Sequence, residues 1–187
     1  MQLFAMLRRM KGNEQREGET DMKSGKAYFR DNFFSSGETD ITDEREWKVG
    51  SLDLHSMFGS GITVRDASGR AVVQGKFRIL SNRWIVSDGT DREIGVLRAK
   101  LTFFAKRFVY ESARGGVLYI ESPAFSNEYE IKTEAGTTAA HFRKISGMFS
   151  AGAFELDNRS ELSMEEMIAV VMGVHAIRKR QQNSAAT

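Results

Sequence analysis

The chain has 187 residues, of which 41% are hydrophobic and 28% are charged, with a single proline and 17 glycines. This composition is typical of one globular domain and excludes collagen-like and low-complexity proteins. The absence of cysteine excludes disulfides, thiolate metal sites and thiol catalysis, and a net charge of +2 is too small to indicate a nucleic-acid-binding face by itself.

Residues 1–26 are expected to form a flexible basic and polar leader and linker. The apolar run at residues 3–7 is too short for a secretory signal and precedes its charges, which favours a cytoplasmic protein. A short helix here would place four apolar residues opposite a basic face suited to anionic lipid, formed by Arg8, Arg9 and Lys11. Because about ten residues are marginal for a helix in water, disorder or packing on the domain is the alternative.

From residue 27 onward, short segments rich in β-branched and aromatic residues alternate with polar turns. Residues 62–77, 84–101 and 129–145 share one pattern of strand, polar turn and strand, and residues 40–52 form a fainter copy. A repeated hairpin unit indicates a closed antiparallel sheet, because closure leaves no exposed strand edges. We therefore expect a β-barrel of roughly ten to twelve strands.

Residues 163–180 predict a helix that is hydrophobic on all sides. Every residue from Met167 to Ile177 is apolar or small except His175, which we interpret as a hydrogen-bonded core histidine. This apolar part is about 16 Å long, whereas a bilayer requires about 20 residues. Because side chains alone cannot fill a barrel of this size, the pattern predicts a helix buried inside the barrel.

The ends of this helix also carry signals. Ser163 and Glu166 match a capping box, and three cations, Arg178, Lys179 and Arg180, would lie at the negative C-terminal pole. The expected folded domain is therefore 27–180, with residues 181–187 as a disordered tail.

Several short motifs follow one another along residues 27–180: Phe33-Phe34-Ser35, repeated D-x-x-G-like turns, Leu101-Thr102-Phe103-Phe104, Glu128-Tyr129-Glu130-Ile131 and the closing apolar helix. Together they resemble the LURP-one-related family and, within it, the bacterial YxjI-like proteins. That family shares the tubby C-terminal-like fold with tubby proteins and phospholipid scramblases. The resemblance implies a mainly β protein, an antiparallel barrel of about twelve strands enclosing a hydrophobic C-terminal helix. It also implies an association with phospholipid surfaces.

Motifs for catalysis are absent from the sequence. The segment 69–76 has the wrong spacing for a phosphate-binding loop, and the three histidines are far apart without metal-ligand spacing. Four acidic residues could supply paired carboxylates, but a solvated polar turn explains them better: Asp40, Asp43, Glu44 and Glu46. We expect no catalytic residue, cofactor or metal.

Lys106 and Arg107 interrupt an aromatic run and are expected at a hairpin tip beside three phenylalanines, Phe103, Phe104 and Phe108. Basic residues next to exposed aromatic ones suit an anionic membrane surface. The alternative is that the aromatic side chains face the core and the charges mark the turn.

These patterns favour a cytoplasmic, non-enzymatic binding module that associates peripherally with phospholipid or with a protein partner, without a transmembrane segment. One alternative is an enzyme or small-ligand binder with a site at the barrel mouth, which requires a pocket with convergent polar groups. A second is a nucleic-acid binder, which requires a continuous basic stripe. No nucleic acid is expected as the partner.

Overall fold

A computed structural model describes residues 25–30, 37–55, 61–100, 106–114, 116–122, 126–145 and 153–185. These residues form twelve strands and one helix. The strands are β1 Gly25–Phe29, β2 Gly37–Thr42, β3 Lys48–Leu54, β4 Gly61–Asp66, β5 Ala71–Phe77, β6 Trp84–Asp88, β7 Glu93–Lys100, β8 Lys106–Ser112, β9 Gly116–Ser122, β10 Tyr129–Thr133, β11 Thr138–Ile145 and β12 Ala153–Asn158. The helix, α2, runs from Met164 to Ala185.

The strands close into an antiparallel barrel in which each pairs with its sequence neighbours and β1 pairs with β12. The expected barrel is confirmed. Its weakest pairing is between β1 and β2, which share only the register pairs Tyr28–Thr42 and Phe29–Ile41, whereas β1 and β12 are paired over five. The outer wall is therefore least continuous along the β1–β2 seam.

The repeated hairpins share one turn structure. In the turns 43–47, 66–70, 88–92 and 133–137 the first residue donates its N–H to the fifth carbonyl, and the fourth donates to the first. In the three turns that begin with aspartate, its carboxylate also accepts the N–H groups of the third and fifth residues. Hydrogen bonds from Ser68 and Thr90 lower the pKa of Asp66 and Asp88 respectively. The sequence repeat is thus a repeat of one capped turn.

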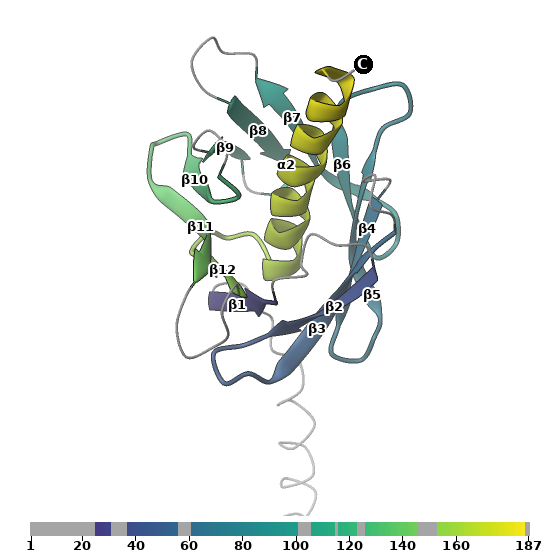
Figure 1. The fold of residues 1–187 in the computed structure, drawn as a ribbon, viewed down its shortest axis with the longest axis vertical. Helices are drawn as coiled ribbons and strands as arrows, with labels where there is room; N and C mark the ends of the chain where they lie inside the picture. The colour runs from purple at the N-terminus through teal and green to yellow at the C-terminus, as the bar shows by residue number, and fades with distance from the viewer. Residues whose placement is uncertain are drawn as a thin grey trace, which may run out of the picture.

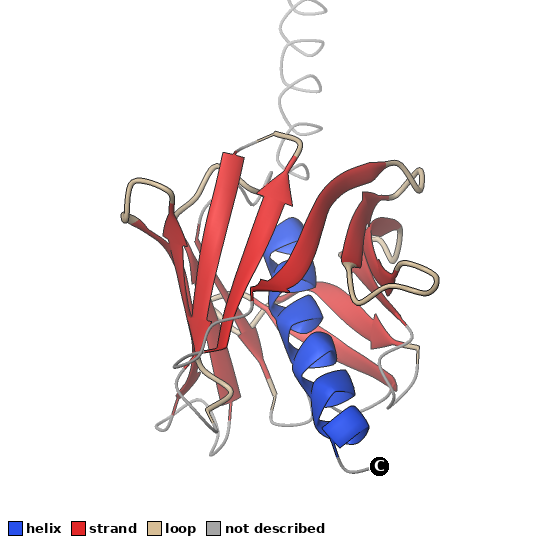
Figure 2. Ribbon diagram, turned by 90° about the horizontal axis from the view of Figure 1, so that it is seen from above, coloured by secondary structure: helices blue, strands red, loops and turns tan. Residues whose placement is uncertain are grey.

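Helix α2 runs lengthwise through the barrel, with strands around it (Figures 1 and 2). It packs against β4, β5, β6, β7 and β12. Its buried apolar side chains include Met167, Ile168, Val170, Val171, Met172, Val174 and Ile177. The central helix predicted from the apolar run is therefore confirmed. Within the described part of the chain, no helix combines the length and the apolar run needed to cross a bilayer.

Trp84 of β6 joins the helix to the barrel wall. Its indole N–H donates a hydrogen bond to the Ala169 carbonyl over 3.1 Å. Two glycines make room for the ring: an added Cβ would lie 2.5 Å from it at Gly173 and 2.6 Å from it at Gly75. This lock between helix and wall requires a tryptophan on the strand and a residue without a side chain on the helix.

Tyrosine side chains from β8 and β10 also reach the helix. Tyr110 donates a hydrogen bond to Glu166 over 2.7 Å, and Ser112 donates to the same oxygen over 3.0 Å. Burial, reinforced by the neighbouring Glu166 carboxylate, raises the pKa of Tyr110. Near the other end of the helix, Arg178 donates to Tyr129 over 3.3 Å. Both buried charges of the helix are thus hydrogen-bonded, as burial requires.

The helix ends differ from the sequence-based expectation. Ser163 accepts the N–H of Glu166 over 3.2 Å, but the Glu166 side chain binds Tyr110 instead of completing the capping box. The helix continues to Ala185, so residues 178–180 are not in its last turn and the expected dipole contact is wrong. Strand β1 begins at Gly25 and α2 ends at Ala185, two residues before and five residues after the expected bounds 27–180.

His175 is the polar residue within the apolar run of the helix. Burial lowers its pKa to about 4, and the positive charges of Lys179 and Arg178 act in the same direction. The half-buried imidazole is therefore neutral near pH 7.

This lowered pKa predicts that the protein loses stability on acidification. The pKa of His175 is 6.5 in the unfolded chain, so between pH 6.5 and pH 4 the unfolded chain binds a proton that the folded chain does not. The contribution of His175 to stability is therefore complete above pH 6.5 and is lost as the pH falls toward 4. We expect a loss on the order of 1–2 kcal/mol between pH 7 and pH 5, measured by urea unfolding. His175→Gln should flatten this dependence while the control His141→Gln retains it; an equal slope in both variants would contradict the assignment.

Candidate functional site

The barrel interior is filled by its own side chains, which leaves the outer surface as the place for a candidate site. Side chains of α2 and the strands form a single buried cluster. Among the described residues, every buried side-chain nitrogen and oxygen atom has a hydrogen-bond partner. A binding site lined by unsatisfied polar groups is therefore absent from the described interior.

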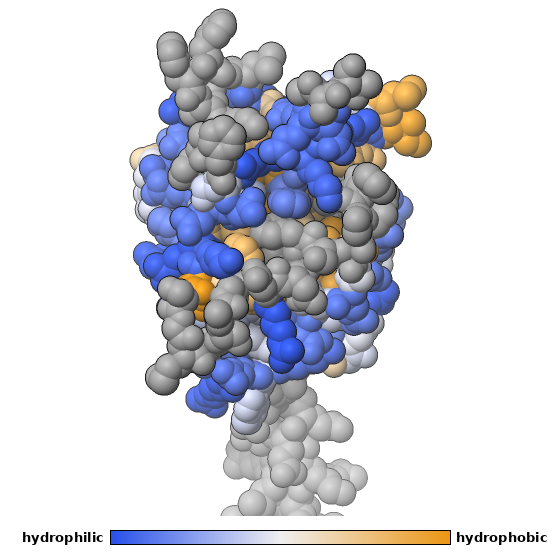
Figure 3. All heavy atoms as spheres, in the orientation of Figure 1, coloured by the Kyte–Doolittle hydropathy of each residue, from blue (hydrophilic) through white to orange (hydrophobic). Residues whose placement is uncertain are grey.

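The β5–β6 turn, residues 78–83, presents the most exposed apolar side chains of the described chain. Ile79 is 88% exposed and Leu80 is 100% exposed. The turn is held by backbone hydrogen bonds from Ser81 to Arg78 and from Arg78 to Arg83. It projects from the wall as an orange apolar tip beside blue polar residues (Figures 1 and 3). We call residues 78–83 the apolar tip.

Leu80 has a strained backbone as well as an exposed side chain. Its φ of 56° lies in the left-handed region, where glycine and asparagine are favoured and a bulky residue is an outlier. Such strain costs on the order of 1–3 kcal/mol and is most often found at functional positions. Neither burial nor local conformation explains a leucine here.

Arginines surround the apolar tip. Arg180 of α2 donates to the Ser81 carbonyl over 3.2 Å and lies 4.6 Å over the Phe77 ring. Arg83 is exposed, and among the described residues no carboxylate forms an ion pair with Arg83 or Arg180. Arg78 by contrast pairs with Glu93 over 2.7 Å. Arg83 within the apolar tip and Arg180 beside it therefore carry positive charges that no described carboxylate pairs.

A hollow of about 290 Å³ lies beside the apolar tip, between the β5–β6 turn and the last turns of the helix. Its lining is Asn82, Arg180, Gln181 and Ser184. These side chains supply a guanidinium and two amides and no carboxylate, while the Ser184 hydroxyl donates its hydrogen bond to the Arg180 carbonyl over 2.9 Å. Such a set of donors matches an anionic group such as a phosphate.

The basic residues that the sequence analysis proposed are placed less favourably. Lys106 and Arg107 lie in β8 itself, and Arg107 forms an ion pair with Glu121 over 3.0 Å. Phe108 is buried in the core, which supports the alternative interpretation for that residue. Phe103 and Phe104, like the leader cations Arg8, Arg9 and Lys11, lie outside the described residues.

The acidic residues near the β2–β3 turn behave as turn chemistry predicts. Asp43 caps the turn by accepting the N–H groups of Arg45 and Trp47. Asp40 pairs with Lys48 over 2.7 Å. No group of three histidine, aspartate or glutamate side chains in the described segments could hold a metal ion.

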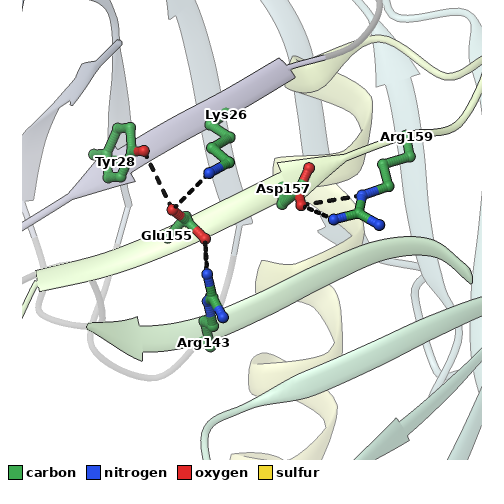
Figure 4. Close-up of polar contacts among 6 residues, drawn as sticks. All are labelled: Lys26, Tyr28, Arg143, Glu155, Asp157 and Arg159. Atoms are coloured by element: carbon green, nitrogen blue, oxygen red, sulfur yellow. Dashed lines mark hydrogen bonds and ion pairs between the residues drawn. The ribbon is translucent and has the colours of Figure 1, made fainter. Parts of the chain in front are cut away.

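A buried carboxylate forms a second polar cluster on the outer wall, across β1, β11 and β12 (Figure 4). Glu155 is 5% exposed and accepts hydrogen bonds from Tyr28 over 3.2 Å and from Arg143 over 2.7 Å. Lys26 adds an ion pair at 3.5 Å. Burial alone would raise the pKa of Glu155, but Arg143 and Lys26 outweigh it and lower the pKa overall. Both carboxylate oxygens of Glu155 thus have partners within the cluster.

The apolar tip does not follow from the sequence patterns described above. Its signal was present in the segment 78–83, RILSNR, where two large apolar residues stand between arginines in a turn that lacks glycine. Whether these two apolar residues are buried or exposed depends on the register of the hairpin, which becomes known only with the structure.

Comparisons with known proteins support the fold. No family model and no curated protein matches the chain. Among solved structures, an X-ray structure of a protein from Arabidopsis thaliana is similar, with a TM-score of 0.57 and 12% identity, covering 84% of this chain and 94% of that one. At this identity the likeness establishes a shared fold only, a mainly β barrel with one C-terminal helix.

Proposed function

We propose that this protein is a non-catalytic, cytoplasmic binding module that associates peripherally with anionic phospholipid through the apolar tip. The observation that carries the proposal is Leu80, fully exposed and strained beside the uncompensated Arg83 and Arg180. An apolar side chain gains free energy by entering the acyl boundary, while arginine is attracted to the negative surface.

Two further features support this orientation. The hollow beside the apolar tip supplies donors for a lipid phosphate close to where Leu80 would enter the membrane. The filled barrel restricts binding to its surface and ends.

For the family, we propose membership of the LURP-one-related, tubby-like class. The proposal rests on the ordered sequence motifs and on the barrel with a buried C-terminal helix. The phospholipid association implied by that resemblance agrees in kind with the chemistry of the apolar tip.

Flotation with phosphatidylserine vesicles tests the function. The wild-type protein should float at low salt and be released near about 0.5 M salt, because screening weakens the arginine contacts. Leu80→Asn should abolish most of the flotation while keeping or raising the melting temperature, since asparagine tolerates the left-handed backbone. Arg83→Gln should weaken flotation severalfold.

Trp47 provides the matched control, because it is also a large apolar residue exposed in a turn, at 68%. Trp47→Ser should float like the wild-type protein. Flotation that survives Leu80→Asn, or that Trp47→Ser reduces equally, would refute the proposed surface.

A further inference from the structure

A cleft of about 200 Å³ lies over the β1–β2 seam, away from the apolar tip. Its lining includes Tyr28, Arg30, Asp40, Asp43, Glu46 and Lys48. The cleft forms where β1 and β2 share only two register pairs, so the sheet is least continuous there. The β2–β3 turn lies beside it. It is smaller than the range of about 300–1,000 Å³ usual for drug-sized ligands, which limits its occupant to a small molecule.

The charges that line the cleft are only partly neutralised. Asp40 and Lys48 form their own ion pair at 2.7 Å, and Asp43 is engaged by the turn. Arg30 and Glu46 also line the cleft, and among the described residues neither side chain forms a hydrogen bond or ion pair. With respect to the described residues, Arg30 and Glu46 are thus open to a further partner, and Asp43 adds a carboxylate whose Oδ1 already accepts two backbone N–H groups.

Tyr28 is held in a fixed position in this lining by the cluster around Glu155. The Glu155 carboxylate accepts its hydroxyl hydrogen bond, and Arg143 and Lys26 hold the carboxylate in turn (Figure 4). Burial and the neighbouring Glu155 raise the pKa of Tyr28 to about 12, so the phenol stays neutral at physiological pH. Tyr28 therefore lines the cleft as a neutral side chain in a fixed position, while Arg143 and Lys26 are both directed at Glu155.

We propose that the cleft is a binding site for a small zwitterion, with the ligand carboxylate at Arg30 and its ammonium group at Glu46. A molecule with both charges satisfies both side chains, whereas an amine or an acid alone leaves one of them without a partner. Glu46 is presented by the turn through a left-handed backbone, with a φ of 63°, and the neighbouring Trp47 is exposed. This site is independent of the lipid-contact surface.

Titration with ω-amino acids of increasing length tests the proposal. The probes are glycine, β-alanine, 4-aminobutanoate and 6-aminohexanoate, with butylamine and butanoate as singly charged controls. Trp47 fluorescence reports on the cleft, because Trp47 shares the turn with Asp43 and Glu46 while Trp84 is fully buried. At least one zwitterion should bind about tenfold more tightly than both controls, as expected for a second charge-assisted contact.

Two substitutions assign the charges. Arg30→Gln should reduce binding of the best zwitterion to the level of butylamine, and Glu46→Gln should reduce it to the level of butanoate. Glu134→Gln, in the equivalent turn between β10 and β11, should bind like the wild-type protein. Amide chemical shifts give a second readout that does not depend on Trp47. No zwitterion exceeding both controls, or equal effects of all three substitutions, would overturn the site.

Discussion

A chain truncated after Leu162 is expected to lose cooperative unfolding and to be insoluble. Truncation removes α2, whose apolar side chains from Met167 to Ile177 are buried in the barrel. About ten side chains lose burial worth roughly 10–20 kcal/mol in total, which exceeds the stability of about 5–15 kcal/mol typical of a domain. Entropy regained by the chain offsets part of this loss but does not restore a filled barrel. Circular dichroism melting and gel filtration measure the result.

A single substitution provides the companion test. Val171→Asp places an unpaired carboxylate in the apolar interior and should be nearly as severe. Gln182→Asp on the exposed last part of the same helix is the control and should melt like the wild-type protein. A truncated protein that melts cooperatively near the parent temperature would contradict the account of the core.

The two tryptophans make a second matched pair. Trp84→Ala removes a fully buried ring that binds the Ala169 carbonyl and fills the space between Gly75 and Gly173, and should cost about 3–5 kcal/mol. Trp47→Ala, at a residue 68% exposed, should change stability by less than about 0.5 kcal/mol. Denaturant unfolding of both variants gives the comparison.

Gly173→Ala separates packing from helix propensity in the same contact. Alanine favours the helix, but its Cβ would lie 2.5 Å from the Trp84 ring, so the substitution should destabilise the protein in spite of the better propensity. Stabilisation by Gly173→Ala, or an effect of Trp84→Ala as small as that of Trp47→Ala, would contradict the claim that Trp84 holds the helix to the wall.

The central helix and the repeated turns could be predicted because a single physical constraint determines each of them. The apolar run in α2 was too short for a bilayer and too uniformly apolar for a surface, so burial inside a barrel was the remaining option. The repeated turns were predictable because aspartate at the first position caps its own backbone. Both signals are local in sequence, and both were confirmed.

The polar contacts of the helix could not be predicted in the same way. Glu166 fits a capping box locally, but Tyr110 and Ser112 of β8 take its carboxylate once the barrel is closed. The helix also continued past residue 180, since glutamine and alanine favour helix and Arg180 is held at Ser81. Tertiary partners far apart in sequence decided these cases.

The candidate surfaces depended on exposure, which the sequence does not record. Ile79 and Leu80 are indistinguishable in composition from core residues, and only the position of the β5–β6 turn leaves them in solvent. Arg180 reaches them from a segment about a hundred residues later, so the basic and apolar parts meet only in the folded barrel.

The most direct test of the proposed lipid contact places a reporter at the apolar tip itself. Leu80→Trp in a Trp47→Phe background leaves Trp84 as a constant, buried signal. On phosphatidylserine vesicles containing brominated acyl chains, the new tryptophan should shift to shorter wavelength and be quenched at low salt, because its ring enters the acyl boundary. Emission that remains that of a water-exposed tryptophan, with no quenching at any lipid concentration, would contradict the claim that this protein contacts membranes through residues 78–83.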